Sequence, residues 1–218
     1  SVDMNCFNTG FFSEQYRDLH TAEQLGMSGS DLMKATTTLL DYLRGDVESI
    51  DVSVTIDGVS QEAFNARERA HMVDFRTLYQ NAMAVRWIAL GVWVASVAAL
   101  ILLRKKAFLD DLSRGFLFVS FLFVLFLILL GIWILADFTG FCTTFHQLFF
   151  TNDLWLLNPA TDRMINLFPE AFFSHLVIRI LLWFLAFYLP CLIVAFYNRR
   201  QSIQMFFFPQ SVGRRQKR

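Results

Sequence analysis

Three apolar stretches without a single charged residue most constrain what this chain can fold into. They are 87–103, 115–136 and 180–197, which are 17, 22 and 18 residues long. A helix needs roughly 17–25 apolar residues to cross the hydrocarbon core of a bilayer. A soluble helix of this length normally keeps a polar stripe, and 115–136 has none. The sequence therefore predicts an all-α membrane protein, mostly helical with a small exported α/β element, and three transmembrane helices.

The composition supports this class and excludes several others. Charged residues make up 17% of the 218 residues, against roughly 25% in an average soluble domain. Nineteen bases balance nineteen acids, which excludes a uniformly basic nucleic-acid binder, so no nucleic-acid partner is expected. Three cysteines are too few for a disulfide scaffold.

Charged residues between the apolar stretches predict the orientation in the membrane. The connector 104–114 carries four bases against two acids, and 198–218 carries six bases and no acid. Short basic loops stay in the cytoplasm, so the remaining segments are expected outside. The predicted division is 1–84 outside, 85–103 spanning, 104–114 inside, 115–136 spanning, 137–179 outside, 180–197 spanning and 198–218 inside.

Export of the first 84 residues requires a signal. Nothing in 1–84 reads as a signal peptide or a membrane anchor. We therefore expect a fourth transmembrane helix to precede this sequence, with a cleaved signal peptide as the alternative.

Local patterns predict the elements of the first exported segment. Ser28 or Ser30 can cap a helix that ends at Gly45. Apolar residues alternate over 50–56 and are followed by an Asp-Gly pair, which predicts one strand or extended arm. No helix breaker follows Ser60, so we expect one continuous helix from there into the first span.

The second exported segment, 137–179, is rich in aromatic residues. A solvated loop would not tolerate that composition. Aromatic rings favour the headgroup zone of a bilayer, and Pro159 and Pro169 interrupt the segment. We expect two short interfacial helices with a turn between them.

His71 is the first candidate for chemistry. Glu68 and Asp74 each lie three positions from it, so both carboxylates can share its helix face. A carboxylate in that position can fix the imidazole tautomer and stabilise the imidazolium of a general base. The same pattern is also typical of an exposed charged helix face.

His146 is the second candidate. It lies among aromatic residues just beyond the second span, closely followed by Asn152, Asp153 and Trp155. An ionisable group in such a setting is costly unless it is paired or used, although a histidine resting among lipid headgroups is the simpler interpretation. The chain has no HExxH or CxxC motif, so no metal ligand and no cofactor is predicted.

Two blocks of sequence carry a resemblance to a known family. They are FNARERAHMVDFRTLY at 64–79 and FHQLFFTNDLWLLNPATDRMINLFPEAFF at 145–173. With their spacing across the spans, the chain resembles the bacterial integral membrane family of lipoprotein intramolecular transacylases. The resemblance implies four spans, a location in the bacterial cytoplasmic (inner) membrane and an active site on its extracytoplasmic face.

The resemblance also implies a reaction. The sn-2 acyl chain of a diacylglyceryl-modified lipoprotein cysteine would move to the α-amino group of the same cysteine, giving the lyso form. Donor and acceptor belong to one molecule, so positioning supplies much of the rate enhancement. No cofactor is needed, and the partners are the lipoprotein substrate and membrane lipids.

This chemistry suggests roles for the candidate residues. His71 is the expected base toward the amine and His146 the expected acid or oxyanion partner, although the two roles could be exchanged. Glu68 or Asp74 would orient His71. The other supporting candidates are Arg67 and Arg69 for an oxyanion or lipid phosphate, and Asn152, Asp153 and Trp155 for the shape of the site.

Two other function classes remain open. The first is a metal-dependent membrane hydrolase built on the same histidines, which metal analysis and chelator sensitivity would reveal. The second is a non-catalytic membrane sensor or assembly module, which predicts no loss of function from single histidine substitutions. A transporter is disfavoured because no span contains an internal Asp, Glu, Lys or Arg.

Overall fold

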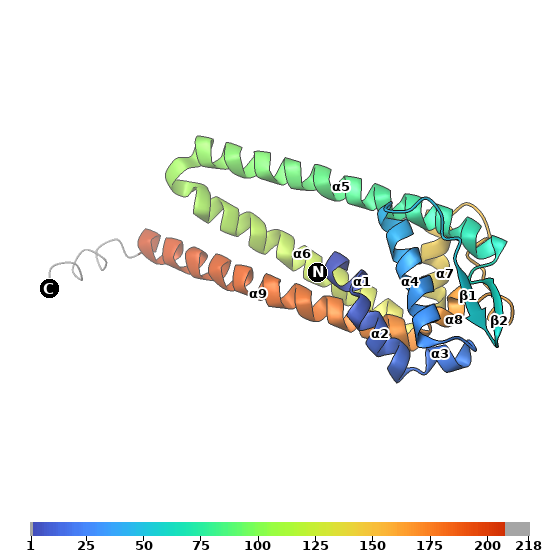
Figure 1. The fold of residues 1–218 in the computed structure, drawn as a ribbon. Helices are drawn as coiled ribbons and strands as arrows, with labels where there is room; N and C mark the ends of the chain where they lie inside the picture. Colours follow the sequence, from blue (N-terminus) through green and yellow to red (C-terminus); the bar gives the residue numbers. More distant parts are fainter. Residues whose placement is uncertain (1, 208–218) are drawn as a thin grey trace. The chain divides into compact units, whose positions relative to one another are not determined.

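The computed structural model describes residues 2–207 and is mostly helical (Figure 1). Three of its helices are long and apolar enough to cross a membrane. The predicted fold class, a mostly helical chain with three candidate spans, is therefore confirmed. The end of the predicted basic tail, 208–218, lies outside the described residues.

The chain divides into two compact units. Unit 1 contains the residues up to Arg86 together with Thr143–Trp183. Unit 2 contains Trp87–Cys142 and the residues from Phe184 onward. All nine candidate site residues fall within unit 1, and the apolar parts of the three long helices fall mainly within unit 2.

Unit 2 is built from the apolar parts of the long helices. They belong to α5 (Ala66–Arg104), α6 (Phe108–Ala136) and α9 (Glu170–Phe207), with the short 3-10 helix η1 (Lys105–Ala107) between α5 and α6. The mean hydropathy of the most apolar window reaches 3.0 in α6. Such windows keep their backbone hydrogen bonds inside the helix, which is what a hydrocarbon environment requires.

Ion pairs join the charged ends of these helices. Arg104 at the end of α5 pairs with Asp111 in the first turn of α6 at 2.7 Å. Asp110 pairs with Arg114 at 2.8 Å and with Arg199 of α9 at 3.0 Å. The two aspartates of the predicted inner connector therefore neutralise arginines from all three long helices.

Unit 1 begins with helices that the sequence patterns only partly predicted. The predicted helix is α4 (Gly29–Arg44): Ser28 Oγ accepts a hydrogen bond from the Asp31 amide at 3.0 Å, and Gly45 ends the helix at a φ of 94°. Only glycine adopts such a φ without strain, so the sequence could predict this helix end. Three shorter helices precede it and were not predicted: α1 (Val2–Cys6), α2 (Thr9–Asp18) and α3 (Thr21–Gln24).

The alternating segment 50–56 forms half of a hairpin rather than a lone strand. β1 (Ser53–Ile56) pairs antiparallel with β2 (Val59–Glu62), and Ile56 lies opposite Val59. Asp57 and Gly58 both have positive φ, at 51° and 81°. Positive φ at both central residues is typical of a type I′ turn, whose twist matches a two-residue hairpin.

The predicted helix from Ser60 is wrong at its start. Ser60 lies in β2, and α5 begins only at Ala66. Absence of a breaker did not indicate a helix here, because cross-strand pairing gives Ser60–Glu62 an alternative set of backbone hydrogen bonds. From Ala66 onward the prediction holds, since α5 runs without interruption to Arg104.

The aromatic segment 137–179, which the sequence predicts to be exported, contains two short helices, α7 (Phe138–Phe149) and α8 (Met164–Leu167). The third long helix starts earlier than predicted, because α9 begins at Glu170 rather than at residue 180. Pro169 immediately precedes it, and a proline at a helix start costs no backbone hydrogen bond.

A single hydrophobic core holds unit 1 together. Leu32 of α4, Val54 of β1 and Phe64 before α5 are almost completely buried in it. Leu167 and Phe172 from the aromatic segment are equally buried in the same core. Part of the aromatic segment thus packs inside the protein, and its location at the depth of the lipid headgroups stays a prediction.

Candidate active site

Glu68 anchors the start of α5 to a distant loop. Its side chain is completely buried, at 0% exposure. Its carboxylate accepts hydrogen bonds from the amides of Asn65 at 2.7 Å and Met164 at 2.5 Å. Asn65 Oδ1 in turn accepts from the Glu68 amide at 3.0 Å, which completes a capping box. Burial raises the pKa of Glu68, and the backbone amides of Met164 and Asn65 oppose that rise.

Asp162 reinforces the same anchor from the loop side. Its carboxylate accepts from the Asn158 amide at 2.6 Å and from Asn65 Nδ2 at 2.7 Å. The Asn158 amide is the main cause of a lowered pKa of Asp162. Neither Asn65 nor Asp162 was a predicted site residue. The Asn-x-x-Glu spacing of a capping box could have indicated Asn65.

The two candidate arginines face different partners. Arg67 donates from Nη2 to the backbone carbonyl of Asp153. Arg69 donates from Nη1 to Glu62 of the hairpin and lies 3.3 Å from Asp51. Arg67 therefore contacts the loop after α7, whereas Arg69 secures the hairpin to α5.

Asp74 makes a second contact with that loop. Its Oδ2 accepts a hydrogen bond from Asn152 Nδ2 at 2.8 Å. Asn152 Oδ1 accepts from the Leu154 amide at 3.0 Å, which fixes the side-chain orientation of the asparagine. Arg67 and Asp74, two helical turns apart on α5, thus hold the loop at two points.

His71 lies between Arg67 and Asp74 in the sequence of α5, but its side chain packs against rings. Its side chain is 8% exposed, and its Nδ1 has no hydrogen-bond partner in the part of the chain that the structure describes. Aromatic rings surround it instead. The ring centroids of Phe150, His146 and Phe75 lie 5.4, 6.1 and 6.5 Å from that of His71.

The surroundings of His71 favour its neutral form. Its pKa is lowered from 6.5 to about 4, first by burial and next by the charge of His146. Arg67 lowers the pKa further, and Asp74 opposes these effects. His71 precedes the first uncharged span by 16 residues, so it lies outside the membrane-spanning segments. It is uncharged at neutral pH, as a general base must be.

His146 completes the pair from α7. Its half-buried imidazole stacks on Trp155, with ring centroids 4.8 Å apart and an interplanar angle of 22°. Phe145 and Phe150 lie at 5.6 and 5.7 Å from it. The arrangement puts two imidazoles side by side in an aromatic enclosure, 75 positions apart in sequence.

Comparison with known proteins identifies the family. The family model of the lipoprotein intramolecular transacylase Lit matches residues 1–173. This chain belongs to that family. A search of curated protein sequences finds no match.

Solved structures of Lit share the fold. The in meso structure of the membrane integral lipoprotein intramolecular transacylase Lit from Bacillus cereus has a TM-score of 0.66 at 21% identity, covering 93% of this chain and 86% of that one. Variants of the same protein with one histidine replaced by alanine or by arginine give TM-scores of 0.68 and 0.65, also at 21% identity. They cover 93% and 96% of this chain and 86% of theirs. The chain is thus an integral membrane protein of the Lit transacylase family.

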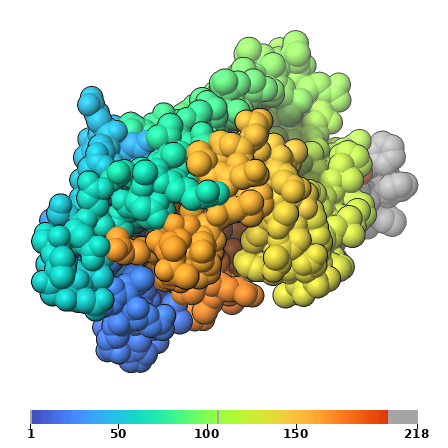
Figure 2. Space-filling model, turned by 90° about the vertical axis from the view of Figure 1, so that its right-hand side faces the viewer, coloured from blue at the N-terminus to red at the C-terminus, as the bar shows by residue number. Residues whose placement is uncertain are grey.

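Most candidate residues of this Lit family member meet on one face of unit 1. Figure 2 shows the start of α5, in teal, beside the loop after α7, in gold, which the Arg67 and Asp74 contacts require. Glu68 and Arg69 bind other groups, the Met164 amide and the hairpin acids. Besides Asn65 and Asp162, the sequence interpretation missed Phe150, which contacts both imidazoles.

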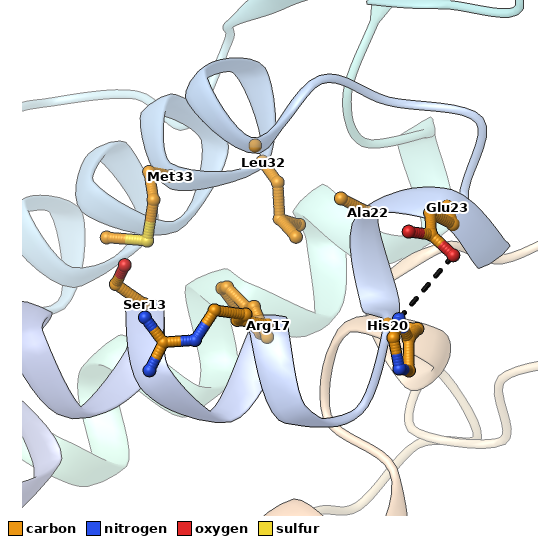
Figure 3. Close-up of a pocket in the computed structure, with 9 residues that line it drawn as sticks. Ser13, Arg17, His20, Ala22, Glu23, Leu32 and Met33 are labelled. Atoms are coloured by element: carbon orange, nitrogen blue, oxygen red, sulfur yellow. Dashed lines mark ion pairs between the residues drawn. The ribbon is translucent and has the colours of Figure 1, made fainter.

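Two further features of the described residues concern metal binding and a cleft. Among the described residues, no group of three or more His, Cys, Asp or Glu side chains could hold a metal ion. A cleft of about 410 Å³ lies elsewhere in unit 1, between α2, α3 and α4 (Figure 3). Its polar rim includes His20 and Glu23, an exposed pair 3.5 Å apart. It contains none of the candidate site residues.

Proposed function

We propose that this chain transfers the sn-2 acyl chain of a diacylglyceryl lipoprotein cysteine to the α-amino group of the same cysteine, with His71 and His146 as its proton-transfer pair. The observation that carries the proposal is the pairing of the two imidazoles at 6.1 Å in a chain of the Lit family. The reaction moves a proton between two atoms of one substrate, and a pair of adjacent imidazoles suits that task.

The reaction balances without any co-reactant. The neutral amine nitrogen attacks the ester carbonyl, and a tetrahedral intermediate forms. The new C–N bond remains, the bond between the carbonyl carbon and the glyceryl oxygen breaks, and one proton passes from nitrogen to that oxygen. The product is an isomer of the substrate, so neither water nor a nucleotide enters the reaction.

His71 is the base in this proposal. Its lowered pKa keeps it neutral, and it accepts the proton that the nitrogen sheds on becoming an amide in the tetrahedral intermediate. His146 then returns a proton to the leaving glyceryl oxygen. Each imidazolium disfavours the other at this distance, so the pair holds one proton at a time and passes it on.

The loop and its surroundings suit a lipid substrate. Arg67 and Asp74 hold Asp153 and Asn152, and the same loop brings Trp155 onto His146. Apolar side chains near the pair on unit 1 are exposed, namely Leu148, Phe149 and Leu156. Exposed apolar residues of this kind suit contact with acyl chains. By the charge distribution, this part of the chain lies on the extracytoplasmic side, and the family resemblance implies the bacterial inner membrane.

Tandem mass spectrometry of lipoprotein N-termini tests the proposal in cells. A strain deleted for this gene would carry the wild type, His71→Ala, His146→Ala or the control His20→Ala, each with membrane levels checked by immunoblot. N-acyl lyso-glyceryl cysteine should form with the wild type and with the exposed-histidine control only. Retention of that product in both His71→Ala and His146→Ala would overturn the mechanism.

A further inference from the structure

Phe150 contacts both members of the histidine pair. Its ring meets His71 edge-on, with centroids 5.4 Å apart and an interplanar angle of 75°. It lies 5.7 Å from His146 at 38°. Phe75 also contacts His71, but at 6.5 Å and from the same helix. Phe150, in contrast, directly follows α7, the helix that carries His146, and packs against both imidazoles.

The burial of Phe150 is local to this pair. Its side chain is 7% exposed, yet it is not part of the hydrophobic core that holds unit 1 together. Its amide donates to the His146 carbonyl at 2.8 Å, which places it one turn after His146 at the end of α7. A buried ring outside the main core, packed on two imidazoles, indicates a role at those imidazoles.

The missing hydrogen bond at His71 supports the same role for Phe150. A base histidine is commonly oriented by a carboxylate or carbonyl on its second nitrogen. Here Asp74 accepts from Asn152 and Glu68 accepts from backbone amides, while the buried Nδ1 of His71 has no partner among the described residues. Packing against rings, rather than a hydrogen bond at Nδ1, thus holds this side of the His71 imidazole.

We propose that Phe150 is a positioning residue for the proton-transfer pair, fixing the His71 and His146 rings against each other and keeping water from His71. The proposal rests on the proposed function in assigning chemistry to the pair. The charged and titratable groups facing His71 are Arg67 and Asp74 on α5 and His146 on α7. Phe150 is uncharged, so it acts on His71 by excluding water and by packing.

Two readouts separate this role from a merely structural one. Burial is the largest cause of the lowered pKa of His71, so admitting water should raise that pKa. We therefore expect Phe150→Ala to raise the pKa of His71 by about one unit or more. We also expect kcat to fall about tenfold or more with little change in KM, because the pair loses its alignment.

The experiment is a histidine-selective NMR titration of the full-length protein in nanodiscs, paired with steady-state kinetics on a diacylglyceryl lipopeptide. Phe150→Leu is measured as well, since it keeps most of the apolar volume and guards against misfolding of the alanine variant. Phe12→Leu is the matched control, because Phe12 is equally buried, at 3% exposure, but lies in the main core.

The outcomes are distinct. A higher His71 pKa and lower kcat in the Phe150 variants, with Phe12→Leu near wild type in both, supports the proposal. An unchanged His71 pKa and kcat in Phe150→Leu and Phe150→Ala, or equal shifts in Phe12→Leu, overturns it. If His71→Ala and His146→Ala stay active while Phe150→Ala still raises the His71 pKa, the proposed function fails and the positioning of the ring stands.

Discussion

Glu68 and His71 lie one turn apart on α5 and are both nearly inaccessible to solvent, but their hydrogen bonding differs. Two backbone amides donate to the Glu68 carboxylate, whereas Nδ1 of His71 has no partner among the described residues and aromatic rings enclose the imidazole. Buried polar groups are normally satisfied, and an exception needs an explanation. Glu68 therefore stabilises the local fold, whereas the unsatisfied nitrogen of His71 supports the proton-transfer role proposed for it.

The largest effect should follow loss of His71. His71→Gln keeps a polar side chain of similar size but cannot gain and release protons near neutral pH. We expect the rate of acyl transfer to fall at least 100-fold, as is typical for loss of a general base, with little change in thermal stability. Single-turnover kinetics and thermal unfolding in the same detergent would measure both. A variant that loses stability but keeps its rate would reverse the comparison.

Glu68 should show the opposite pattern. Glu68→Ala leaves the Asn65 and Met164 amides unsatisfied and should lower the free energy of unfolding by about 4 kcal/mol. Glu68→Gln keeps one oxygen acceptor for a capping box and should recover part of that loss. Denaturant unfolding followed by tryptophan fluorescence would rank the stabilities of wild type, Glu68→Gln and Glu68→Ala. Equal stability of Glu68→Ala and wild type would show that Glu68 does not anchor the loop.

These two residues show how far the sequence could predict the site. The spacing of Glu68, His71 and Asp74 predicted that either carboxylate could reach the helix face of His71. The spacing could not predict the partner of each carboxylate, because those partners, Met164 and Asn152, lie 96 and 78 positions away. Long-range packing decides such contacts, and helical periodicity carries no information on it.

The fold shows the same division between local and distant information. The spans and α4 were predictable, because apolar length and capping residues act locally. The pairing of Ser60 in β2 was missed because it depends on a partner strand. The start of α9 at Glu170 was missed although Pro169, a local signal, precedes it. Phe150 could not be distinguished from its aromatic neighbours, because only the fold brings it to both histidines.

The pH dependence of stability sharpens the same comparison. Because the pKa of His71 is lowered from 6.5 to about 4 in the folded state, its contribution to stability is complete above pH 6.5 and is lost as the pH falls toward 4. The loss should not exceed about 3 kcal/mol. Glu68 acts in the opposite sense, because a raised pKa stabilises at low pH and the contribution fades as pH rises.

Unfolding midpoints between pH 4 and 7 would test this. His71→Gln should flatten the decline on acidification, and Glu68→Gln should steepen it. Parallel curves for wild type and His71→Gln would contradict the assignment of a neutral, buried His71.

The smallest effect should come from the loop contact between Asp74 and Asn152. Their 2.8 Å hydrogen bond is partly solvent-accessible, so a double-mutant cycle of Asp74→Ala and Asn152→Ala should give a coupling energy of about 1 kcal/mol. The coupling should appear both in stability and in kcat, because the same loop positions Trp155 on His146. Strict additivity of the two variants would show that this contact does not hold the loop.

The central claim is that the adjacent imidazoles of His71 and His146 transfer a proton within one substrate molecule. Its most direct test follows a synthetic diacylglyceryl lipopeptide incubated with the purified protein in nanodiscs, by intact and tandem mass spectrometry. We expect the wild type to form a product of unchanged mass whose fragments carry one acyl chain on the α-amino group, and His71→Gln and His146→Gln to form none. Release of free fatty acid with gain of one water, or unchanged conversion by both variants, would contradict it.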